Sequence, residues 1–298
     1  MRISILFILL LASLLITGSS FAASGPLQLK YVHSVYDDEK ETGLKHPAGV
    51  GCTDEYFIVA DTGNNRLVKY TFQKNVAKVV DLEMEISSPL AVQINSKGDI
   101  YALGGRDRRI VIFNPDGTEK GKLAAKGSPV ARQMVPRSFK IGQDDKIYIL
   151  DISEGVVLIL DPAGNYLRHV AFPEQAGFFS DLAVDALGTV FLLDSTKVAV
   201  YAAAPDAEQF SLRSTGTKEY ANFPTNIAVD SNNFIFLVDQ HGGNLVILNP
   251  SGSFLGHKFG FGWKETQFYY PSQLCISKAG NVFIADSGNS RIQIFVSQ

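Results

Sequence analysis

The chain has 298 residues, with 27 Lys and Arg against 30 Asp and Glu and a formal net charge of −3. A chain of this length can bury a large core, and the sequence lacks the concentrated basic face of nucleic-acid binders. Only two cysteines are present, which excludes a disulfide scaffold and the paired Cys and His motifs of zinc sites. We therefore expect a fold held by its hydrophobic core and no nucleic-acid partner.

The first 22 residues have the pattern of an export signal. The basic Arg2 precedes an apolar stretch from Ile3 to Ile16, and Ser20-Phe21-Ala22 fits the small-x-small pattern that signal peptidase cuts. The apolar stretch is shorter than the ~20 residues that cross a bilayer as a helix, so a retained anchor is the weaker alternative. The sequence predicts a signal peptide over 1–22, a mature domain over 23–298 without stable membrane insertion, and a periplasmic or extracellular location.

An internal repeat fills the rest of the chain. A Pro or Phe followed by a short apolar run recurs at positions 47, 89, 136, 179, 224 and 271, which are 42 to 47 residues apart. This period is typical of the four-stranded blades of a β-propeller. The sequence predicts six blades that start near residues 46, 88, 135, 178, 223 and 270.

Each repeat is expected to form four short strands. In the fifth repeat, runs over 226–230, 234–239, 244–248 and 253–258 are separated by turns rich in Asn, Gly, Ser and Pro. Strands of about five residues between such turns indicate antiparallel hairpins. No stretch has the sustained periodicity of a helix, so the predicted fold class is all-β.

The two ends of the chain complete one blade between them. The sixth repeat stops after its third strand, and residues 27–35, ahead of the first repeat, offer the missing fourth. A propeller closed in this way leaves no open sheet edge. We therefore expect a single six-bladed β-propeller of four-stranded antiparallel blades, closed by an N-terminal strand.

The turns of the first and last repeats carry a family resemblance. The segments DTGNNR (61–66) and DSGNSR (286–291) resemble NHL repeats, and the chain is similar to bacterial exported NHL-repeat propellers. The middle four repeats keep only parts of this turn, and such a match implies the fold without implying a function. Asp and Asn shape tight turns, and Arg can pair with the turn aspartate. We expect these structural roles for Asp61, Asn64, Arg66, Asp286, Asn289 and Arg291.

The channel mouth is the first place to look for a ligand. The two residues after each repeat anchor fall where the inner strands begin, and four of them are unusual polar residues. Polar groups that converge on one axis could bind a small polar ligand or a hard cation. The alternative is a water-filled channel lined by polar side chains, and the sequence favours this alternative over a ligand site. The candidates are Arg137, Asp181, Asn226 and Gln273.

Two kinds of six-bladed enzyme resemble the chain in architecture. Calcium-dependent lactonases need a Glu, Asn, Asn and Asp set around the channel, but the first two blades offer Ala48, Gly49, Leu90 and Ala91. Peptide-amidating lyases bind zinc through histidines, and only His46 maps near the start of an inner strand. No Gly-x-Ser-x-Gly nucleophile motif occurs. A catalytic role is therefore not favoured, and no cofactor is expected, with calcium or zinc at the channel as the alternative.

The two cysteines fall on neighbouring inner strands. Cys52 and Cys275 belong to the first and last blades, which meet where the ring closes. Adjacent blades often hold their Cα atoms too far apart for a disulfide. Two buried thiols are therefore the favoured expectation, and a disulfide that staples the ring is the alternative.

The most plausible function is binding. Variable loops enter the blades of a rigid scaffold, among them 122–135 and the aromatic-rich 256–270. An exposed aromatic cluster would suit recognition, but the same rings could instead pack between blades. We expect a monomeric scaffold that binds a protein partner or a small polar ligand. A metal-assisted lyase or hydrolase at the channel mouth is the alternative. The aromatic residues concerned are Phe259, Phe261, Trp263, Phe268, Tyr269 and Tyr270.

Overall fold

The computed structural model describes residues 28–297, apart from residues 75, 131–132, 175–176 and 215–216. The predicted signal peptide, residues 1–22, lies outside the described residues. In the described part of the chain, no helix is long and apolar enough to span a membrane.

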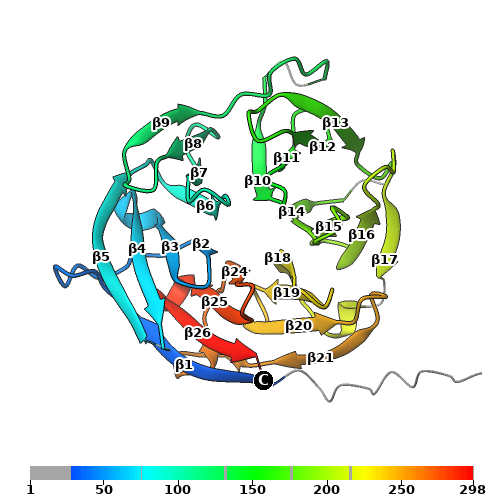
Figure 1. The fold of residues 1–298 in the computed structure, drawn as a ribbon. Coiled ribbons are helices and arrows are strands. Elements are labelled where there is room, and N and C mark those ends of the chain that lie inside the picture. Colours follow the sequence, from blue (N-terminus) through cyan, green and yellow to red (C-terminus); the bar gives the residue numbers. More distant parts are fainter. Residues whose placement is uncertain (1–27, 75, 131–132, 175–176, 215–216, 298) are drawn as a thin grey trace, which may run out of the picture.

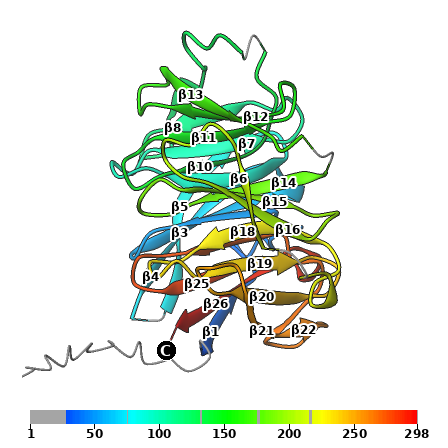
Figure 2. The same cartoon turned by 90° about the vertical axis from the view of Figure 1, so that its right-hand side faces the viewer.

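Six four-stranded antiparallel sheets stand around a central axis (Figure 1). Figure 2 shows the same sheets from the side of the ring. The first strand of each repeat is the innermost strand of its blade and faces the channel (Figure 1). The predicted fold, an all-β six-bladed propeller, is confirmed.

The strands follow the repeat. Blade 1 contains β2 (Gly49–Cys52), β3 (Tyr56–Asp61), β4 (Arg66–Gln73) and β5 (Val76–Glu85). Blade 2 contains β6 (Pro89–Ile94), β7 (Ile100–Gly104), β8 (Ile110–Phe113) and β9 (Glu119–Lys122). Blade 3 contains β10 (Pro136–Ile141), β11 (Ile147–Asp151), β12 (Val156–Leu160) and β13 (Tyr166–Ala171). Blade 4 contains β14 (Phe179–Val184), β15 (Val190–Asp194), β16 (Ala199–Ala203) and β17 (Ser211–Ser214).

The last two blades complete the ring. Blade 5 contains β18 (Pro224–Val229), β19 (Ile235–Asp239), β20 (Asn244–Leu248) and β21 (Phe254–Lys258). A short parallel pair, β22 (Gly260–Phe261) and β23 (Gln267–Phe268), lies in the loop that follows. Blade 6 contains β24 (Gln273–Ile276), β25 (Asn281–Asp286), β26 (Arg291–Ser297) and the N-terminal β1 (Leu29–Val35). Single 3₁₀ turns occur at Thr62–Asn64, Thr217–Glu219 and Ser287–Asn289.

The N-terminal strand closes the ring, as the sequence predicts. Strand β1 pairs antiparallel with β26, from Leu29 opposite Ser297 to Val35 opposite Ile292. Strand β26 therefore has a partner on each side, and the last blade has the same four strands as the others. The first and last parts of the chain thus share one sheet.

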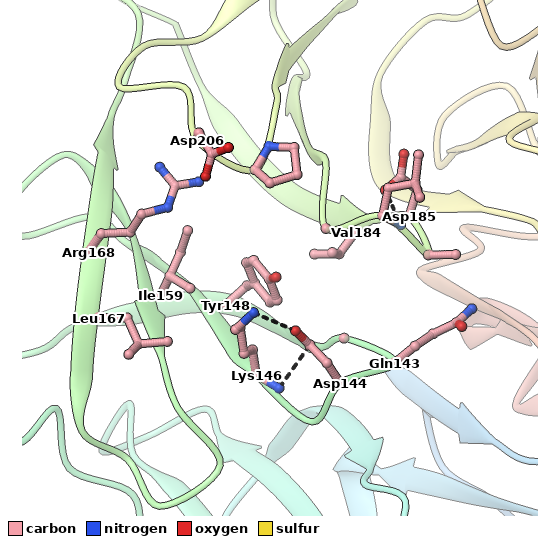
Figure 3. Close-up of a pocket in the computed structure, with 15 residues that line it drawn as sticks. Gln143, Asp144, Lys146, Tyr148, Ile159, Leu167, Arg168, Val184, Asp185 and Asp206 are labelled. Atoms are coloured by element: carbon pink, nitrogen blue, oxygen red, sulfur yellow. Dashed lines mark hydrogen bonds and ion pairs between the residues drawn. The ribbon is translucent and has the colours of Figure 1, made fainter.

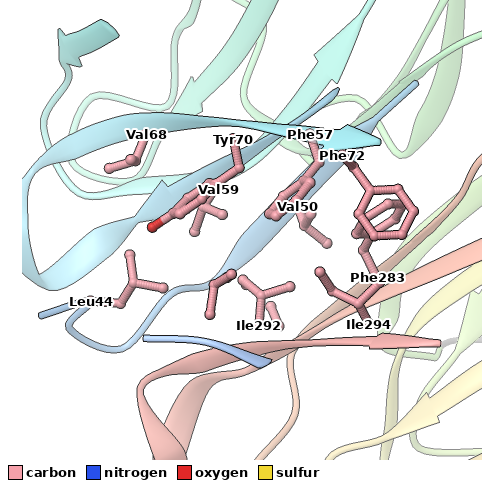
Figure 4. Close-up of a cluster of buried hydrophobic side chains, with 12 residues drawn as sticks. Leu44, Val50, Phe57, Val59, Val68, Tyr70, Phe72, Phe283, Ile292 and Ile294 are labelled. Carbon is pink, nitrogen blue, oxygen red and sulfur yellow. The ribbon is translucent and has the colours of Figure 1, made fainter. Parts of the chain in front are cut away.

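The core is a ring of hydrophobic clusters, one at each blade-to-blade interface. At the closure, Phe57 of blade 1 stacks on Tyr70 at 4.9 Å between ring centroids and contacts Phe283 of blade 6 at 4.8 Å (Figure 4). The second strand of a blade is packed on both faces, and all five residues of β7, β11, β15 and β19 are buried. Two-sided burial explains why these strands are continuous apolar runs rather than alternating ones.

The cysteines form a disulfide, so the expectation of two buried thiols is wrong. The Cα atoms of Cys52 and Cys275 are 5.9 Å apart, within the usual span of a disulfide, and the two Sγ atoms are bonded. The bond joins β2 to β24 across the closure. Inner strands converge toward the channel, and this brings neighbouring blades closer than the general spacing of blades suggests.

The inner strands carry a bulge that the sequence does not reveal. In β6, β10, β14 and β18 the pairing with the second strand shifts after the first residue, which leaves one residue of the inner strand unpaired. A bulge redirects the side chain that it carries. The bulged residues are Leu90, Arg137, Ser180 and Thr225.

Candidate binding surface at the channel mouth

The two sides of the ring differ in which ends of the strands they present. We call the side on which the inner strands begin the mouth face, and the opposite side the far face. Because the strands are antiparallel, the turn between the second and third strands of each blade also lies on the mouth face. The NHL-like turns and the loops that enter each blade therefore meet on the same side.

An aspartate organises this face in five blades. It ends the second strand, and its Oδ1 accepts a hydrogen bond from the backbone N–H of a residue that leads into the inner strand of the same blade. The carboxylate therefore fixes the angle at which each loop enters its blade. The pairs are Asp61 with Lys45, Asp151 with Val135, Asp194 with Phe178, Asp239 with Phe223 and Asp286 with Tyr269.

The NHL-like turns add an arginine brace to this arrangement. Arg66 Nε donates to Asp61 Oδ2 at 2.9 Å, and Asn64 Nδ2 donates to the same oxygen at 2.8 Å. Blade 6 repeats this geometry, with Arg291 Nε 2.7 Å and Asn289 Nδ2 2.8 Å from Asp286 Oδ2. In each of these two turns, the Asp, Asn and Arg side chains thus hold the turn together.

Arg66 also ties the first blade to the segment after β1. Its Nη1 donates to Asp38 Oδ2 at 2.5 Å, and both side chains are largely buried. Burial by itself would raise the pKa of Asp38, but hydrogen bonds from Arg66, Thr42 and Lys40 hold it below its ordinary value. The ion pair therefore stabilises the closure of the ring.

Three of the four channel candidates link neighbouring inner strands. Asp181 Oδ2 accepts from the backbone N–H of Ile227 at 3.1 Å, and Asn226 Oδ1 accepts from that of Leu274 at 2.9 Å. Gln273 Oε1 accepts from the backbone N–H of Val50 at 2.9 Å. Each side chain thus reaches the next blade around the ring, from blade 4 to blade 5, then to blade 6 and to blade 1.

These three side chains are buried rather than open to the channel. Asp181 and Asn226 are 2% exposed and Gln273 is 5% exposed. Asp181 also accepts from Ser138 and Asn226, and the Lys140 ammonium lies 3.4 Å from its Oδ2. The structure therefore places these groups in a series of hydrogen bonds between the inner strands of neighbouring blades, and ligand binding by them stays a prediction.

Arg137 is the exception among the four. It is the bulged residue of β10, is only half-buried, and holds its guanidinium carbon 4.3 Å from the ring centre of Phe178. Its Nε is buried and has no hydrogen-bond partner in the described structure. Burial, and next the nearby charge of Arg108, lower the pKa of Arg137. This side chain carries a positive charge at the mouth with part of its donor capacity unused.

Aromatic rings continue from Arg137 across the mouth face. Phe178 is 6.1 Å from Phe223 between ring centroids, Phe223 stacks on His241 at 5.0 Å, and His241 lies 6.2 Å from Tyr270. Tyr270 in turn contacts Tyr269 at 4.7 Å. We call this set the aromatic chain. It extends to Phe261, 6.1 Å from Tyr270, and to Trp263, 6.0 Å from Tyr269.

Several members of the aromatic chain are open to solvent. Trp263 is 71% exposed, Phe261 47%, Tyr270 44% and Phe178 38%. The predicted aromatic cluster over 256–270 is therefore divided. Phe268 is buried and Phe259 packs 4.5 Å from Phe295 in the core between blades 5 and 6, while the other rings lie on the mouth face.

The sequence contains the signal for the aromatic chain. The residues immediately before the repeat anchors of blades 4, 5 and 6 are Phe178, Phe223 and Tyr270. This column faces the mouth, one position before the two columns that predict the channel candidates. His241 belongs to the turn between the second and third strands of blade 5, which lies on the same face.

The histidines do not gather at one point. His46 is exposed and its Nδ1 lies 3.3 Å from the Ser287 carbonyl oxygen, while His169 Nδ1 lies 2.7 Å from the Tyr166 hydroxyl. Among the described residues, no three His, Cys, Asp or Glu side chains are placed to hold one metal ion. His241 takes part in the aromatic chain.

A pocket of about 260 Å³ lies on the far face, between blades 3 and 4 (Figure 3). Its walls come from the turns that follow the inner strands β10 and β14 and from β13. Lys146 and Asp144 form a 2.6 Å ion pair within one of these turns, and Arg168 donates to the Ala207 carbonyl oxygen at 2.8 Å. Its main charged groups are thus engaged locally, unlike Arg137 on the mouth face.

Comparisons with known proteins agree with this architecture. Residues 268–295 match the model of the NHL repeat. This chain is a six-bladed β-propeller with an NHL repeat in its last blade. A comparison with curated protein sequences finds no match.

Several solved structures share the fold at low sequence identity. A gluconolactonase from Xanthomonas campestris is 14% identical with a TM-score of 0.67, and the match covers 92% of this chain and 91% of that one. Virginiamycin B lyase from Staphylococcus aureus is 11% identical with a TM-score of 0.62, over 91% of this chain and 99% of that one. A pyrroloquinoline quinone-bound aldose sugar dehydrogenase from Streptomyces coelicolor is 14% identical with a TM-score of 0.61, over 91% and 98%. At this identity the likeness shows the fold alone.

Proposed function

We propose that this protein is an exported, monomeric binding module of the cell envelope that recognises a protein partner on its mouth face. The observation that carries the proposal is the aromatic chain, a set of exposed rings contributed by blades 4, 5 and 6 and next to Arg137. Trp, Tyr and Arg are the residues enriched at the energetic centres of protein interfaces. Monomeric proteins rarely leave such groups exposed together without a use.

The scaffold suits this role. Hydrogen bonds from Asp181, Asn226 and Gln273 join neighbouring inner strands. The Asp-centred turns fix the loops of the mouth face. A surface that is fixed before binding loses little conformational freedom when the partner docks. The disulfide between Cys52 and Cys275 supports export, because such bonds persist in oxidising compartments.

Site-specific photocross-linking tests the proposal. Benzoylphenylalanine placed at position 263 or 270 should give one defined protein adduct in the cell envelope after irradiation. The matched control is position 187 on the far face, where Leu187 is 77% exposed and should give none. Equal adducts from both faces, or none from the mouth face, would overturn the proposal.

Elemental analysis separates this proposal from a metal-assisted lyase or hydrolase. The purified mature protein is expected to carry no stoichiometric calcium or zinc. One bound ion per chain that is lost in the Asp181→Ala variant would instead favour the enzyme. The measurement is inductively coupled plasma mass spectrometry on protein purified without chelators.

A further inference from the structure

The positive charge at one end of the aromatic chain is not balanced within the protein. The ion pairs of the described residues include neither Arg137 nor Arg108, which lies in the turn between β7 and β8 on the mouth face of the neighbouring blade 2. The chain as a whole carries a net charge of −3, so this local excess of positive charge runs against the overall balance. Two adjacent cations without an anion repel each other, and an anionic group between them would relieve that repulsion.

The backbone of β10 and the ring of Phe178 fix the position of the Arg137 side chain. The bulge in β10 directs its side chain out of the strand pairing, and the ring of Phe178 supports one face of the guanidinium at 4.3 Å. Stacking on an aromatic ring leaves the edges of the guanidinium free to donate hydrogen bonds. Its Nε is buried without an acceptor in the described structure, so the two Nη groups are the part of the guanidinium that a ligand can reach.

The chemistry of the missing acceptor follows from these contacts. A guanidinium fork matches the two oxygens of a carboxylate in a bidentate pair. Phe178 and Phe223 extend from the same point as an apolar surface, so the carboxylate should be flanked by apolar groups. An acidic side chain with apolar neighbours in a protein partner meets both requirements.

We infer that Arg137, with Arg108 beside it and Phe178 beneath it, binds an Asp or Glu carboxylate of the protein partner. This inference rests on the proposed function and adds the chemical class of the partner segment. The acidic residue docks on Arg137, and its apolar neighbours lie along the aromatic chain toward Tyr270. The aromatic chain and the Arg137 guanidinium together then determine which segments of a partner bind.

The test is a display selection of random linear peptides on the mature protein. Peptides enriched on the wild type are expected to carry an Asp or Glu flanked by apolar residues. Binding of a selected peptide is then measured by fluorescence polarisation. The Arg137→Gln variant should weaken it by about tenfold or more, as expected for the loss of a charge-assisted pair. The matched control is Arg106→Gln, which removes the same charge from an exposed position in the same turn as Arg108 and should change the affinity little.

Each other outcome contradicts the inference in a different way. Selected peptides that lack acidic residues, lose affinity in Tyr270→Ala and bind Arg137→Gln normally would overturn the carboxylate site and leave the mouth face as the binding surface. No enrichment of any peptide would overturn both proposals. Binding of polygalacturonate in place of peptides, lost in Arg137→Gln, would assign the site to an acidic glycan and also contradict the inference. Circular dichroism of each variant confirms that the fold is kept.

Discussion

Single carboxylates carry much of the organisation of this propeller. Asp61 and Asp286 each accept hydrogen bonds from an arginine, an asparagine and a backbone amide. Asp181 accepts hydrogen bonds from groups on two neighbouring inner strands. Such groups are expensive to leave unpaired, because a buried donor or acceptor that loses its partner keeps its desolvation cost. Stability should therefore depend strongly on a few polar residues.

The Asp38–Arg66 pair makes one part of the stability dependent on pH. The folded pKa of Asp38 lies below its unfolded value, so its contribution is present above the unfolded pKa and is lost as the pH falls through the folded pKa, below about pH 4. Asp38→Asn should lower the free energy of unfolding at pH 7 by about 1.5–3 kcal/mol. The measurement is urea denaturation at several pH values.

The difference between wild type and Asp38→Asn should shrink as the pH falls below about 4. Glu39→Gln, a change at the exposed neighbouring residue, serves as the control and should show no comparable effect. A loss in Asp38→Asn that is the same at every pH would show that Asp38 acts through its shape and not its charge.

Removal of Asp181 should weaken the contacts of its inner strand with the two neighbouring inner strands. Asp181→Ala leaves the Lys140 ammonium, the Asn226 amide and the Ile227 N–H without their acceptor. We expect a loss of about 3–5 kcal/mol in the free energy of unfolding, the usual result of breaking a buried charge pair. Asp144→Ala, which breaks a half-exposed ion pair with Lys146, should cost less than about 1 kcal/mol. Equal losses in the two variants would contradict the role of Asp181.

The sequence predicts where these residues lie but not what they do. The repeat places Asp181, Asn226 and Gln273 in one column at the channel mouth, which is correct as a position. The direction of Asp181 and Asn226 depends on the bulges in β14 and β18, and a bulge has no mark in a single sequence. The side chains of this column join neighbouring blades, and ligand binding by them stays a prediction, while the bulged Arg137 faces the mouth.

Among the elements, both an inner-strand bond and an outer strand close the ring. The disulfide joins β2 to β24, and β1 completes the sheet of β24, β25 and β26. The sequence predicts the closing strand because the sixth repeat is incomplete. It does not decide between thiols and a disulfide, because that depends on the distance between two inner strands.

Loss of the disulfide should weaken the closure without changing the fold. The bond spans 223 residues of sequence, and in the chain-entropy model a bond over a long loop stabilises mainly by restricting the unfolded chain. The double variant Cys52→Ser with Cys275→Ser should lose about 2–5 kcal/mol of unfolding free energy. Dithiothreitol should lower the stability of the wild type to the level of the variant and leave the variant unchanged. A wild type that does not respond to the reductant under denaturing conditions would contradict the bond.

In the whole molecule, the repeat decides the architecture, and the proposed binding surface comes from residues that depart from the repeat. Six similar blades give a closed scaffold, and any sequence with this period and these turns would be expected to form one. The aromatic chain arises from residues that only blades 4, 5 and 6 share, together with a loop before blade 6. The column before the repeat anchors predicts three of these rings, but the contacts among them follow only once the ring places the distant loops side by side.

The proposed export of the protein gives a further expected outcome. Cleavage after Ala22 should leave a secreted protein that begins at Ala23. N-terminal sequencing of the protein recovered from the periplasm or the medium checks this prediction. A chain that keeps residues 1–22 and sediments with membranes would instead indicate a retained anchor.

Trp263 provides a direct probe of the mouth face as the proposed binding surface. Trp263 is the only tryptophan of the protein and is exposed at one end of the aromatic chain. Binding of the cross-linked partner or a selected peptide should shift its emission to shorter wavelength and protect it from acrylamide quenching. Calorimetry would confirm binding independently, with a partner that contains no tryptophan. Saturating binding with no change in the emission or quenching of Trp263 would contradict binding at the mouth face.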